Sequence, residues 1–315
     1  MDNIKIFSGR SHPELSRQIA EYLGLPLGRV TIEDFPDGET LVKLDEDVRG
    51  RDLFYVQSTC TPVNENLMEL LIFIECARRA SAKRITAVMP YFGYARQDRK
   101  DEGRVPITAK LVANLITTAG ADRVLTMDLH AGQVQGFFDL PVDNLYAEPI
   151  LSRYYNDQNL QPLVLLSPDV GNAKRARQYA RRLNGELAII DKRRISGTQA
   201  SMSRIIGDVR GKNVLMIDDM ISTAGTIAQA AELAKSEGAG RILAGATHGV
   251  LCGPAVERLQ AAPIEEVVVT NTIPVSEQTM RSLPNLKVLS VAELMGEAIH
   301  RIHNDQSVSG LFLKE

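Results

Sequence analysis

The stretch VLMIDDMISTAGT, residues 214–226, joins an apolar run, two adjacent carboxylates and a loop of small residues. Unbroken apolar runs of this kind are typical of strands that are buried on both faces of a parallel sheet. The run ends at Asp218 and Asp219, and the residues after 222–226 have helical periodicity. The stretch therefore predicts a strand, a tight loop and a helix, the repeating pattern of the α/β class.

The rest of the chain repeats this alternation. Short β-branched runs predict strands at 4–7, 52–57, 84–90, 123–128, 162–168, 187–191, 213–218, 242–248 and 267–271. Between several of them lie amphipathic stretches, such as 66–81 and 226–239, whose apolar residues recur with helical spacing. We expect an α/β fold of mostly parallel sheets with helices on both faces.

An internal repeat divides the chain. Three pairs of segments align: 50–59 with 211–220, 82–88 with 240–246, and 122–128 with 265–271. Two copies of one unit explain this alignment, although unrelated α/β units also resemble one another at this level. In the first copy, Gln57 and Ser58 stand where the second has Asp218 and Asp219.

A length of 315 residues accommodates two domains. We place them at 1–147 and 148–296, with a segment 297–315 that packs on the first.

Composition excludes several classes of function. The net charge is −3 and the basic clusters are short, so we expect a phosphorylated small molecule rather than a nucleic acid as the anionic partner. Three widely spaced cysteines predict neither a disulfide framework nor a zinc site. The chain shows no secretory signal and no apolar run long enough to cross a membrane. We expect a cytoplasmic protein.

The chemistry of 214–226 favours a sugar phosphate. Ligands of α/β sheets bind beyond the carboxyl ends of the strands, and the first turn of a helix binds anions. The loop 222–226 suits a phosphate, and Asp218 and Asp219 suit vicinal hydroxyls. The alternative is an N-capping Asp with a tight turn, which accounts for one carboxylate but not for two.

The same stretch resembles the phosphoribosyl-diphosphate signature of type I phosphoribosyltransferases and of ribose-phosphate diphosphokinases. Further stretches resemble the phosphate-activated class of the diphosphokinases: FPDGE (35–39), VRG (48–50), NLMELL (66–71), YFGYARQDRK (91–100), DLH (128–130), SPDVG (167–171), DKRR (191–194) and SVSGLF (307–312). The resemblance runs almost from end to end. It implies two tandem type I phosphoribosyltransferase-like domains, with ATP on the first and ribose 5-phosphate on the second.

The resemblance also implies roles for individual residues. ATP contacts fall on Phe35, Asp37, Gly38, Glu39, Arg96 and Gln97. Ribose 5-phosphate contacts fall on Arg194, Asp218, Asp219, Ser222, Thr223, Ala224, Gly225 and Thr226. The catalytic residues are Lys192 and Arg194, and Mg2+ is assigned to His130 and Asp169, with Asp128 as a further donor. Taken alone, FPDGE is typical of a β-turn, and a histidine at a strand end is more often structural.

The implied reaction transfers the diphosphoryl group of ATP to the 1-hydroxyl of ribose 5-phosphate and leaves AMP. Members of this class assemble dimers into hexamers, with the FPDGE segment completing a neighbouring subunit's site. They respond to phosphate and ADP at positions equivalent to Arg49, Ser81, Lys83, Arg84 and 307–309. Two rival functions are a nucleobase phosphoribosyltransferase and a non-catalytic regulatory paralogue. The chain departs from most relatives at Ser222, where they have Asp, and from many at Ala224 and Asn172, where they have Gly.

Overall fold

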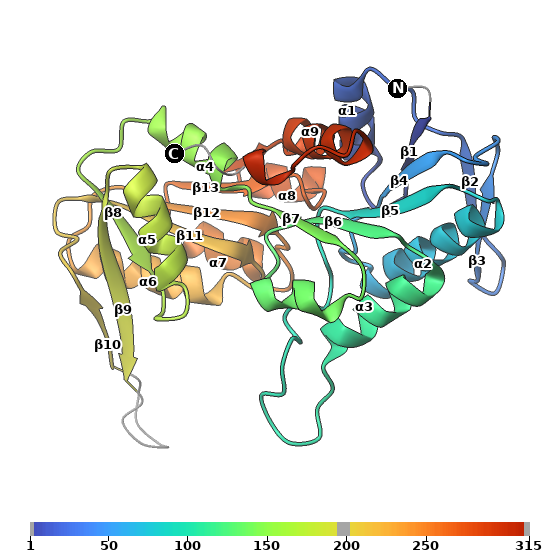
Figure 1. Ribbon diagram of the computed structural model, residues 1–315. Helices are drawn as coiled ribbons and strands as arrows, with labels where there is room; N and C mark the ends of the chain where they lie inside the picture. Colours follow the sequence, from blue (N-terminus) through green and yellow to red (C-terminus); the bar gives the residue numbers. More distant parts are fainter. Residues whose placement is uncertain (1–2, 194–201, 312–315) are drawn as a thin grey trace. The chain divides into compact units, whose positions relative to one another are not determined.

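Two α/β units make up the chain in the computed structural model, which describes residues 3–193 and 202–311 (Figure 1). The first unit comprises Met1–Tyr146, Thr272–Pro274 and Ser290–Glu315. The second comprises Ala147–Asn271 and Val275–Leu289. The end of the chain thus belongs to the unit in which the chain begins.

The first unit is built on a parallel sheet with the strand order β1-β4-β5-β6-β7. Its strands are β1 (Ile4–Ser8), β4 (Asp52–Val56), β5 (Arg84–Met89), β6 (Arg123–Met127) and β7 (Val142–Leu145). A separate antiparallel pair consists of β2 (Val30–Asp34) and β3 (Thr40–Leu44). The helices are α1 (Pro13–Leu23), α2 (Val63–Arg79), α3 (Thr108–Ala119) and α9 (Ala292–His303), with short 3-10 helices η1 (Gly132–Phe137) and η2 (Ser309–Leu311).

Helices cover both faces of this sheet (Figure 1). On one face, α2 and α3 enclose a buried cluster in which Tyr55 of β4 stacks on Phe73 of α2 at 3.7 Å between ring centroids. On the other face, α1 packs against α9. Local signals fix the bounds of α1, since His12 accepts a hydrogen bond from the amide of Leu15 and Gly24 ends the helix at φ 67°.

The second unit has a seven-stranded sheet with the order β10-β9-β8-β11-β12-β13-β14. Its strands are β8 (Leu163–Ser167), β9 (Glu186–Arg193), β10 (Met202–Ile206), β11 (Asn213–Ile221), β12 (Ile242–Gly249), β13 (Glu266–Thr270) and β14 (Leu286–Leu289). Only β10 runs antiparallel to its neighbour within the described part of this sheet. The helices are α4 (Glu148–Asn156), α5 (Ala173–Arg182), α6 (Gly225–Ser236), α7 (Ala255–Ala261) and α8 (Glu277–Ser282).

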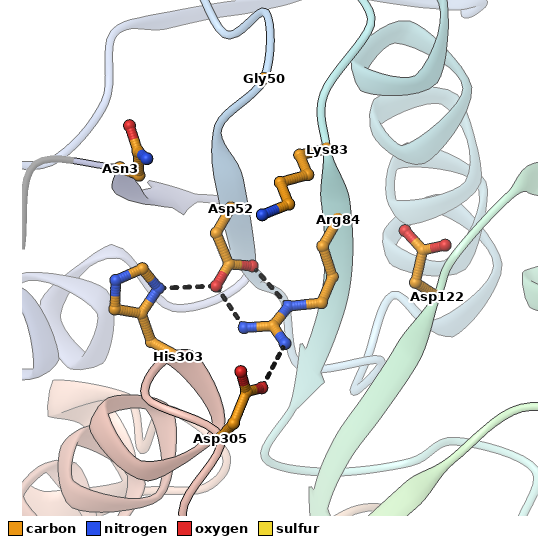
Figure 2. Close-up of a pocket in the computed structure, with 8 residues that line it drawn as sticks. All are labelled: Asn3, Gly50, Asp52, Lys83, Arg84, Asp122, His303 and Asp305. Atoms are coloured by element: carbon orange, nitrogen blue, oxygen red, sulfur yellow. Dashed lines mark hydrogen bonds and ion pairs between the residues drawn. The ribbon is translucent and has the colours of Figure 1, made fainter.

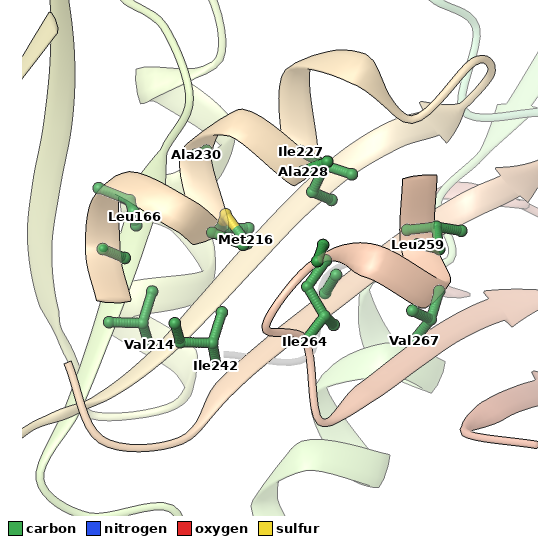
Figure 3. Packing of buried hydrophobic residues seen from close by; sticks show 14 of the residues in the cluster. Leu166, Val214, Met216, Ile227, Ala228, Ala230, Ile242, Leu259, Ile264 and Val267 are labelled. Carbon is green, nitrogen blue, oxygen red and sulfur yellow. The ribbon is translucent and has the colours of Figure 1, made fainter. Parts of the chain in front are cut away.

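Alternate residues of the central strands face opposite layers of helices. Val214 and Met216 of β11 pack with Ile227 of α6 and Leu259 of α7 in one buried cluster (Figure 3). On the opposite face, Tyr155 of α4 donates a hydrogen bond to the Ala244 carbonyl at 3.1 Å. Gly245 permits this approach, because a Cβ there would lie 2.8 Å from the tyrosine hydroxyl oxygen. The expected α/β class, with helices on both faces of mostly parallel sheets, is confirmed.

The strand orders also show the internal repeat. In the first sheet β4, β5 and β6 are neighbours, and in the second β11, β12 and β13 are neighbours in the same order. Gln57 and Ser58, which align with the acidic pair, are fully buried. The Gln57 amide donates to Glu69 Oε1 at 2.9 Å, and the Ser58 hydroxyl donates to the Thr272 carbonyl. The first copy thus uses these positions for internal hydrogen bonds.

Within the described ranges, no helix is long and apolar enough to cross a membrane.

Candidate functional site

The acidic pair lies inside β11 rather than after its end. The sequence predicts that this strand stops at residue 218, but pairing with β12 continues to Met220 opposite His248 and Ile221 opposite Gly249. The other neighbour, β8, pairs with β11 only as far as Leu215. The two carboxylates therefore lie beyond the last paired residues of β8, while β12 still holds their backbone in an extended conformation.

Arg175 of α5 contacts both carboxylates. Its Nη1 atom lies 3.3 Å from Asp218 Oδ1 and 3.1 Å from Asp219 Oδ1. Asp219 is only 4% exposed, whereas Asp218 is half-buried. Burial, with the neighbouring Asp219 carboxyl, raises the pKa of Asp218 to about 8, and the Arg175 charge opposes this rise.

The first turn of α5 is anchored to the same region of the sheet. Asp169, which follows β8, accepts a hydrogen bond from the Asn172 amide at 2.9 Å. The Asn172 side chain donates to the Ile217 carbonyl of β11 at 2.7 Å. Asn172 and Arg175 are three residues apart and so lie on the same side of the helix. Asp169 and the acidic pair therefore belong to the same edge of this sheet.

The loop 222–226 leads directly into the N-terminus of α6, which begins at Gly225. Ala224 precedes the helix at φ 58°, a left-handed conformation that glycine adopts at lower cost. Arg258 of α7 donates to the Thr223 carbonyl at 3.0 Å, and Ser222 Oγ lies 3.4 Å from Cys252 Sγ. The first turn of a helix offers amide donors that favour an anion, so the phosphate site predicted for this loop stays a prediction that the helix start at Gly225 supports.

In the first unit, four of the predicted residues follow neighbouring parallel strands. Arg96 and Gln97 come after β5, and Asp128 and His130 come after β6, which pairs with β5. The carboxyl ends of parallel strands meet at one edge of a sheet. The Gln97 carbonyl accepts the amide of Ala109 at 3.1 Å, which ties the segment to the start of α3. Asp128 adopts φ 41°, a strained conformation that is common at functional sites.

The FPDGE segment is the turn of the β2–β3 hairpin. The Phe35 amide donates to the Glu39 carbonyl and the Gly38 amide donates to the Phe35 carbonyl, both at 2.8 Å. Gly38 has φ 91°, which accounts for the glycine. Phe35 is 49% exposed, and Asp37 and Glu39 are exposed as well. An exposed aromatic ring beside two carboxylates is able to contact a ligand or another chain.

The predicted magnesium donors lie in different units: Asp128 and His130 in the first and Asp169 in the second. Among residues 3–193 and 202–311, no group of three or more His, Cys, Asp and Glu side chains is placed to hold a metal. Mg2+ keeps several waters and substrate phosphates and needs only one or two carboxylates. Asp128 and Asp169 supply hard oxygen donors, each in its own unit. Their chemistry suits Mg2+ better than zinc.

Comparisons with known proteins cover nearly the whole chain. Residues 4–120 match the N-terminal domain of ribose phosphate pyrophosphokinase, and residues 194–313 match the phosphoribosyl synthetase-associated domain. The chain is 60% identical over 315 residues to a ribose-phosphate pyrophosphokinase of Rhodopirellula baltica, and the match covers 99% of both chains. The chain belongs to the ribose-phosphate pyrophosphokinase family.

Other members of the family agree with this assignment. A ribose-phosphate pyrophosphokinase of Clostridium perfringens is 56% identical, with 98% of each chain covered. A crystal structure of phosphoribosylpyrophosphate synthetase from Mycobacterium smegmatis matches with a TM-score of 0.91 and 45% identity, covering 96% of this chain and 99% of that one. The recognition from the sequence is therefore confirmed at the level of family and fold.

The two predicted catalytic residues of this family member fall at the edge of the described chain. Lys192 belongs to β9, next to β8 in the sheet. Arg194 lies outside the described residues. Their roles, like those of the other site residues, stay predictions.

Sequence reasoning did not identify Arg175 and Arg258 as site residues. Arg175 is 43 residues before Asp218 in the chain, and Arg258 is 35 residues after Thr223. Neither arginine belongs to a stretch that resembles the family signature. The sequence offered one signal, and it concerns Arg175. This residue follows Asn172 by three positions, at the start of a helix that comes after a strand.

We expect Arg258→Gln to weaken the phosphate loop without unfolding the protein. Arg258 is exposed, and its hydrogen bond to the Thr223 carbonyl holds the loop against α7. Loss of a charge-assisted hydrogen bond costs about 1.4 kcal/mol, so the KM for ribose 5-phosphate should rise about tenfold. Steady-state kinetics test this, with Arg281→Gln on the exposed helix α8 as the control. Equal KM values for the two variants would exclude a role for Arg258.

A second polar cluster lies at the amino ends of β4 and β5 in the first unit (Figure 2). Arg84 donates to Asp52 at 2.9 Å and to the Ile302 carbonyl at 3.0 Å, and His303 Nδ1 lies 2.7 Å from Asp52 Oδ2. These contacts hold the end of α9 on the sheet. The cluster, together with Lys83, lines a cavity of about 460 Å3. Arg84, one of the predicted effector positions, is thus already engaged by internal partners.

Proposed function

We propose that this protein transfers the diphosphoryl group of ATP to the 1-hydroxyl of ribose 5-phosphate and forms 5-phosphoribosyl 1-diphosphate and AMP. The observation that carries the proposal is the Asp218–Asp219 pair, followed by a small-residue loop at a helix N-terminus, in a member of this family. In the reaction the ribose 1-oxygen bonds to the β-phosphorus of ATP and loses its proton. The bond between the β-phosphorus and the oxygen bridging to the α-phosphorus breaks, and AMP leaves with that oxygen.

The second unit binds the acceptor in this proposal. Asp218 and Asp219 accept hydrogen bonds from vicinal ribose hydroxyls. The 5-phosphate lies in the loop formed by Ser222, Thr223, Ala224, Gly225 and Thr226, where backbone amides and hydroxyls donate to it. Such fixed contacts orient the 1-hydroxyl, and orientation supplies much of the rate in reactions of this type.

The first unit binds the donor. We assign the adenine to the exposed hairpin turn that carries Phe35, Asp37, Gly38 and Glu39, and the ATP chain to Arg96 and Gln97. An aromatic ring stacks on a base, and a carboxylate accepts a hydrogen bond from its amino group. The exposure of the turn supports a site that a neighbouring copy completes.

Cations stabilise the transferring group. Lys192 and Arg194 are the proposed catalytic residues, since a lysine point charge and an arginine fork both suit phosphoryl oxygens. Asp128 and His130 in the first unit and Asp169 in the second are the proposed magnesium ligands. When bound, Mg2+ neutralises negative charge on the phosphates.

Further properties of the family form part of the proposal. We assign ATP binding to residues 1–147 and ribose 5-phosphate binding to residues 148–296, with 297–315 as a segment that packs on the first domain. We also propose a homo-oligomer in which dimers form a hexamer, phosphate and ADP as effectors, and a cytoplasmic location.

One assay tests the function and its rivals. AMP formation from ATP is followed with and without ribose 5-phosphate and with and without Mg2+. We expect AMP only when all three are present. A nucleobase phosphoribosyltransferase would instead consume 5-phosphoribosyl 1-diphosphate in the presence of a base, and a regulatory paralogue would be inactive in both assays. Absence of ribose-dependent AMP would refute the proposed reaction.

A further inference from the structure

Arg175 is a cation that the proposed mechanism leaves without a role. One nitrogen of its guanidinium lies within 3.3 Å of both acidic side chains. The Asp219 amide donates to Asp218 Oδ1 at 2.8 Å, so the oxygen that meets Arg175 is also held by the backbone. The two carboxylates are thus oriented before any ligand binds.

The helix that carries Arg175 is itself fixed at this point. Asn172 joins the start of α5 to the Ile217 carbonyl, one residue before the acidic pair. Asp169 accepts the Asn172 amide and holds the preceding turn. The Arg175 guanidinium therefore projects from a helix whose first turn is hydrogen-bonded to the strand that carries its partners. This arrangement limits the motion of the guanidinium relative to the two carboxylates.

The charges around the pair explain why a cation is needed. The groups that act on the Asp218 carboxyl are Asp219 on the same strand, Arg175 on α5 and Asp169 after β8, while β12 places Ala246 opposite it. Two of these three charges are negative, and the site is partly desolvated. Burial and the neighbouring carboxyl favour protonation of Asp218, and the Arg175 charge opposes this and favours the ionised form. A protonated carboxyl is a weaker acceptor for a sugar hydroxyl than a carboxylate.

We propose that Arg175 is a positioning residue for ribose 5-phosphate: its contacts orient Asp218 and Asp219 to accept hydrogen bonds from the ribose hydroxyls, and its charge favours the ionised form of the pair. The inference rests on the proposed function for the identity of the ligand. It goes beyond that function because it assigns the orientation and the ionisation of the acidic pair to a side chain on helix α5.

The test measures binding of ribose 5-phosphate to the full-length protein by titration calorimetry between pH 5 and pH 9. Arg175→Gln should weaken binding about a hundredfold at pH 7, since two charge-assisted contacts are lost. The acid limb of the binding profile should also move upward by about one pH unit, because the pKa of Asp218 rises when the cation is removed. Arg175→Lys should restore the acid limb but only part of the affinity, since lysine keeps the charge without the planar fork.

Arg177→Gln is the matched control, because Arg177 is exposed on the same helix and the substitution removes the same charge. The phosphate of the ligand titrates near pH 6 in every variant, so comparison with this control isolates the protein's contribution. An acid limb that is the same in Arg175→Gln and Arg177→Gln would overturn the inference, as would a wild-type protein that does not bind ribose 5-phosphate. Wild-type binding without AMP formation would refute the proposed reaction and leave the role of Arg175 to be decided by the variants.

Discussion

Asp218→Asn is expected to reduce ribose 5-phosphate-dependent AMP formation at least about a hundredfold while making the ligand-free protein more stable at alkaline pH. The amide keeps the shape of the side chain but accepts more weakly from a sugar hydroxyl. Burial and the neighbouring Asp219 raise the pKa of Asp218 to about 8 in the folded protein, from an ordinary value of 3.8. Folding therefore favours the protonated carboxyl.

The free energy of unfolding therefore depends on pH through the Asp218 carboxyl. Because the folded state binds the proton more tightly than the unfolded state, the contribution of Asp218 to stability is greatest below pH 4. It is lost as pH rises from about 4 to about 8. Asparagine does not titrate, so the Tm of Asp218→Asn should exceed that of the wild type increasingly as pH approaches 8, and the excess should level off above it.

Scanning calorimetry at pH 5, 6, 7, 8 and 9 checks this result. Asp157→Asn is the control, because Asp157 is an exposed residue at the end of α4 in the same unit. We expect its Tm to follow the wild type at every pH. If Asp218→Asn and Asp157→Asn gave parallel curves, the acidic pair would not be under electrostatic strain in the ligand-free protein.

Apart from the edge strand β1, the strands that the sequence predicted are interior strands with a largely apolar pattern. β4, β5, β11 and β12 are interior strands, and their side chains are almost all buried on both faces. The missed strands β7, β10 and β14 are at sheet edges. Such strands have a neighbouring strand on one side only. A half-exposed strand has a mixed composition that single-sequence patterns do not separate from a loop.

In the site, residues that are contiguous in the sequence could be predicted, whereas residues that packing brings together could not. The acidic pair and the loop 222–226 are contiguous, so their spacing alone indicated a sugar phosphate. The length of β11 was not predictable, because it depends on how far β12 continues beside it. Arg175 and Arg258 reach the site through the orientation of α5 and α7, and no pattern in the sequence encodes those orientations.

In the first copy, the two positions equivalent to the acidic pair take part in internal hydrogen bonds. There Gln57 belongs to a buried network around Glu69, which is 1% exposed. Tyr55 donates to Glu69 Oε1 at 2.8 Å, and the Arg10 side chain donates to Glu69 Oε2 at 2.6 Å. Arg10 also contacts Asp34 at 2.6 Å and 3.0 Å, and Asp34 is the last residue of β2, immediately before the FPDGE turn. One arginine thus links a buried carboxylate to the proposed adenine site.

Arg10→Met should therefore affect both stability and ATP binding. Methionine keeps the length of the side chain but leaves Glu69 buried with no charged partner, which costs about 3 kcal/mol in the free energy of unfolding. The hairpin also loses its link through Asp34, so the KM for ATP should rise while the KM for ribose 5-phosphate changes less. Urea denaturation and steady-state kinetics measure the two effects.

Arg17→Met provides the comparison. Arg17 also bonds two carboxylates, Glu14 and Glu21, but all three side chains are at least half exposed on α1. Ion pairs in water contribute little, because solvent already stabilises each charge. We expect no measurable change in the urea midpoint or in either KM for this variant. If both arginine variants behaved alike, the buried Glu69 would not depend on its cation. If Arg10→Met lost stability without a change in the KM for ATP, Arg10 would support the fold of the first unit but not the hairpin's contact with the nucleotide.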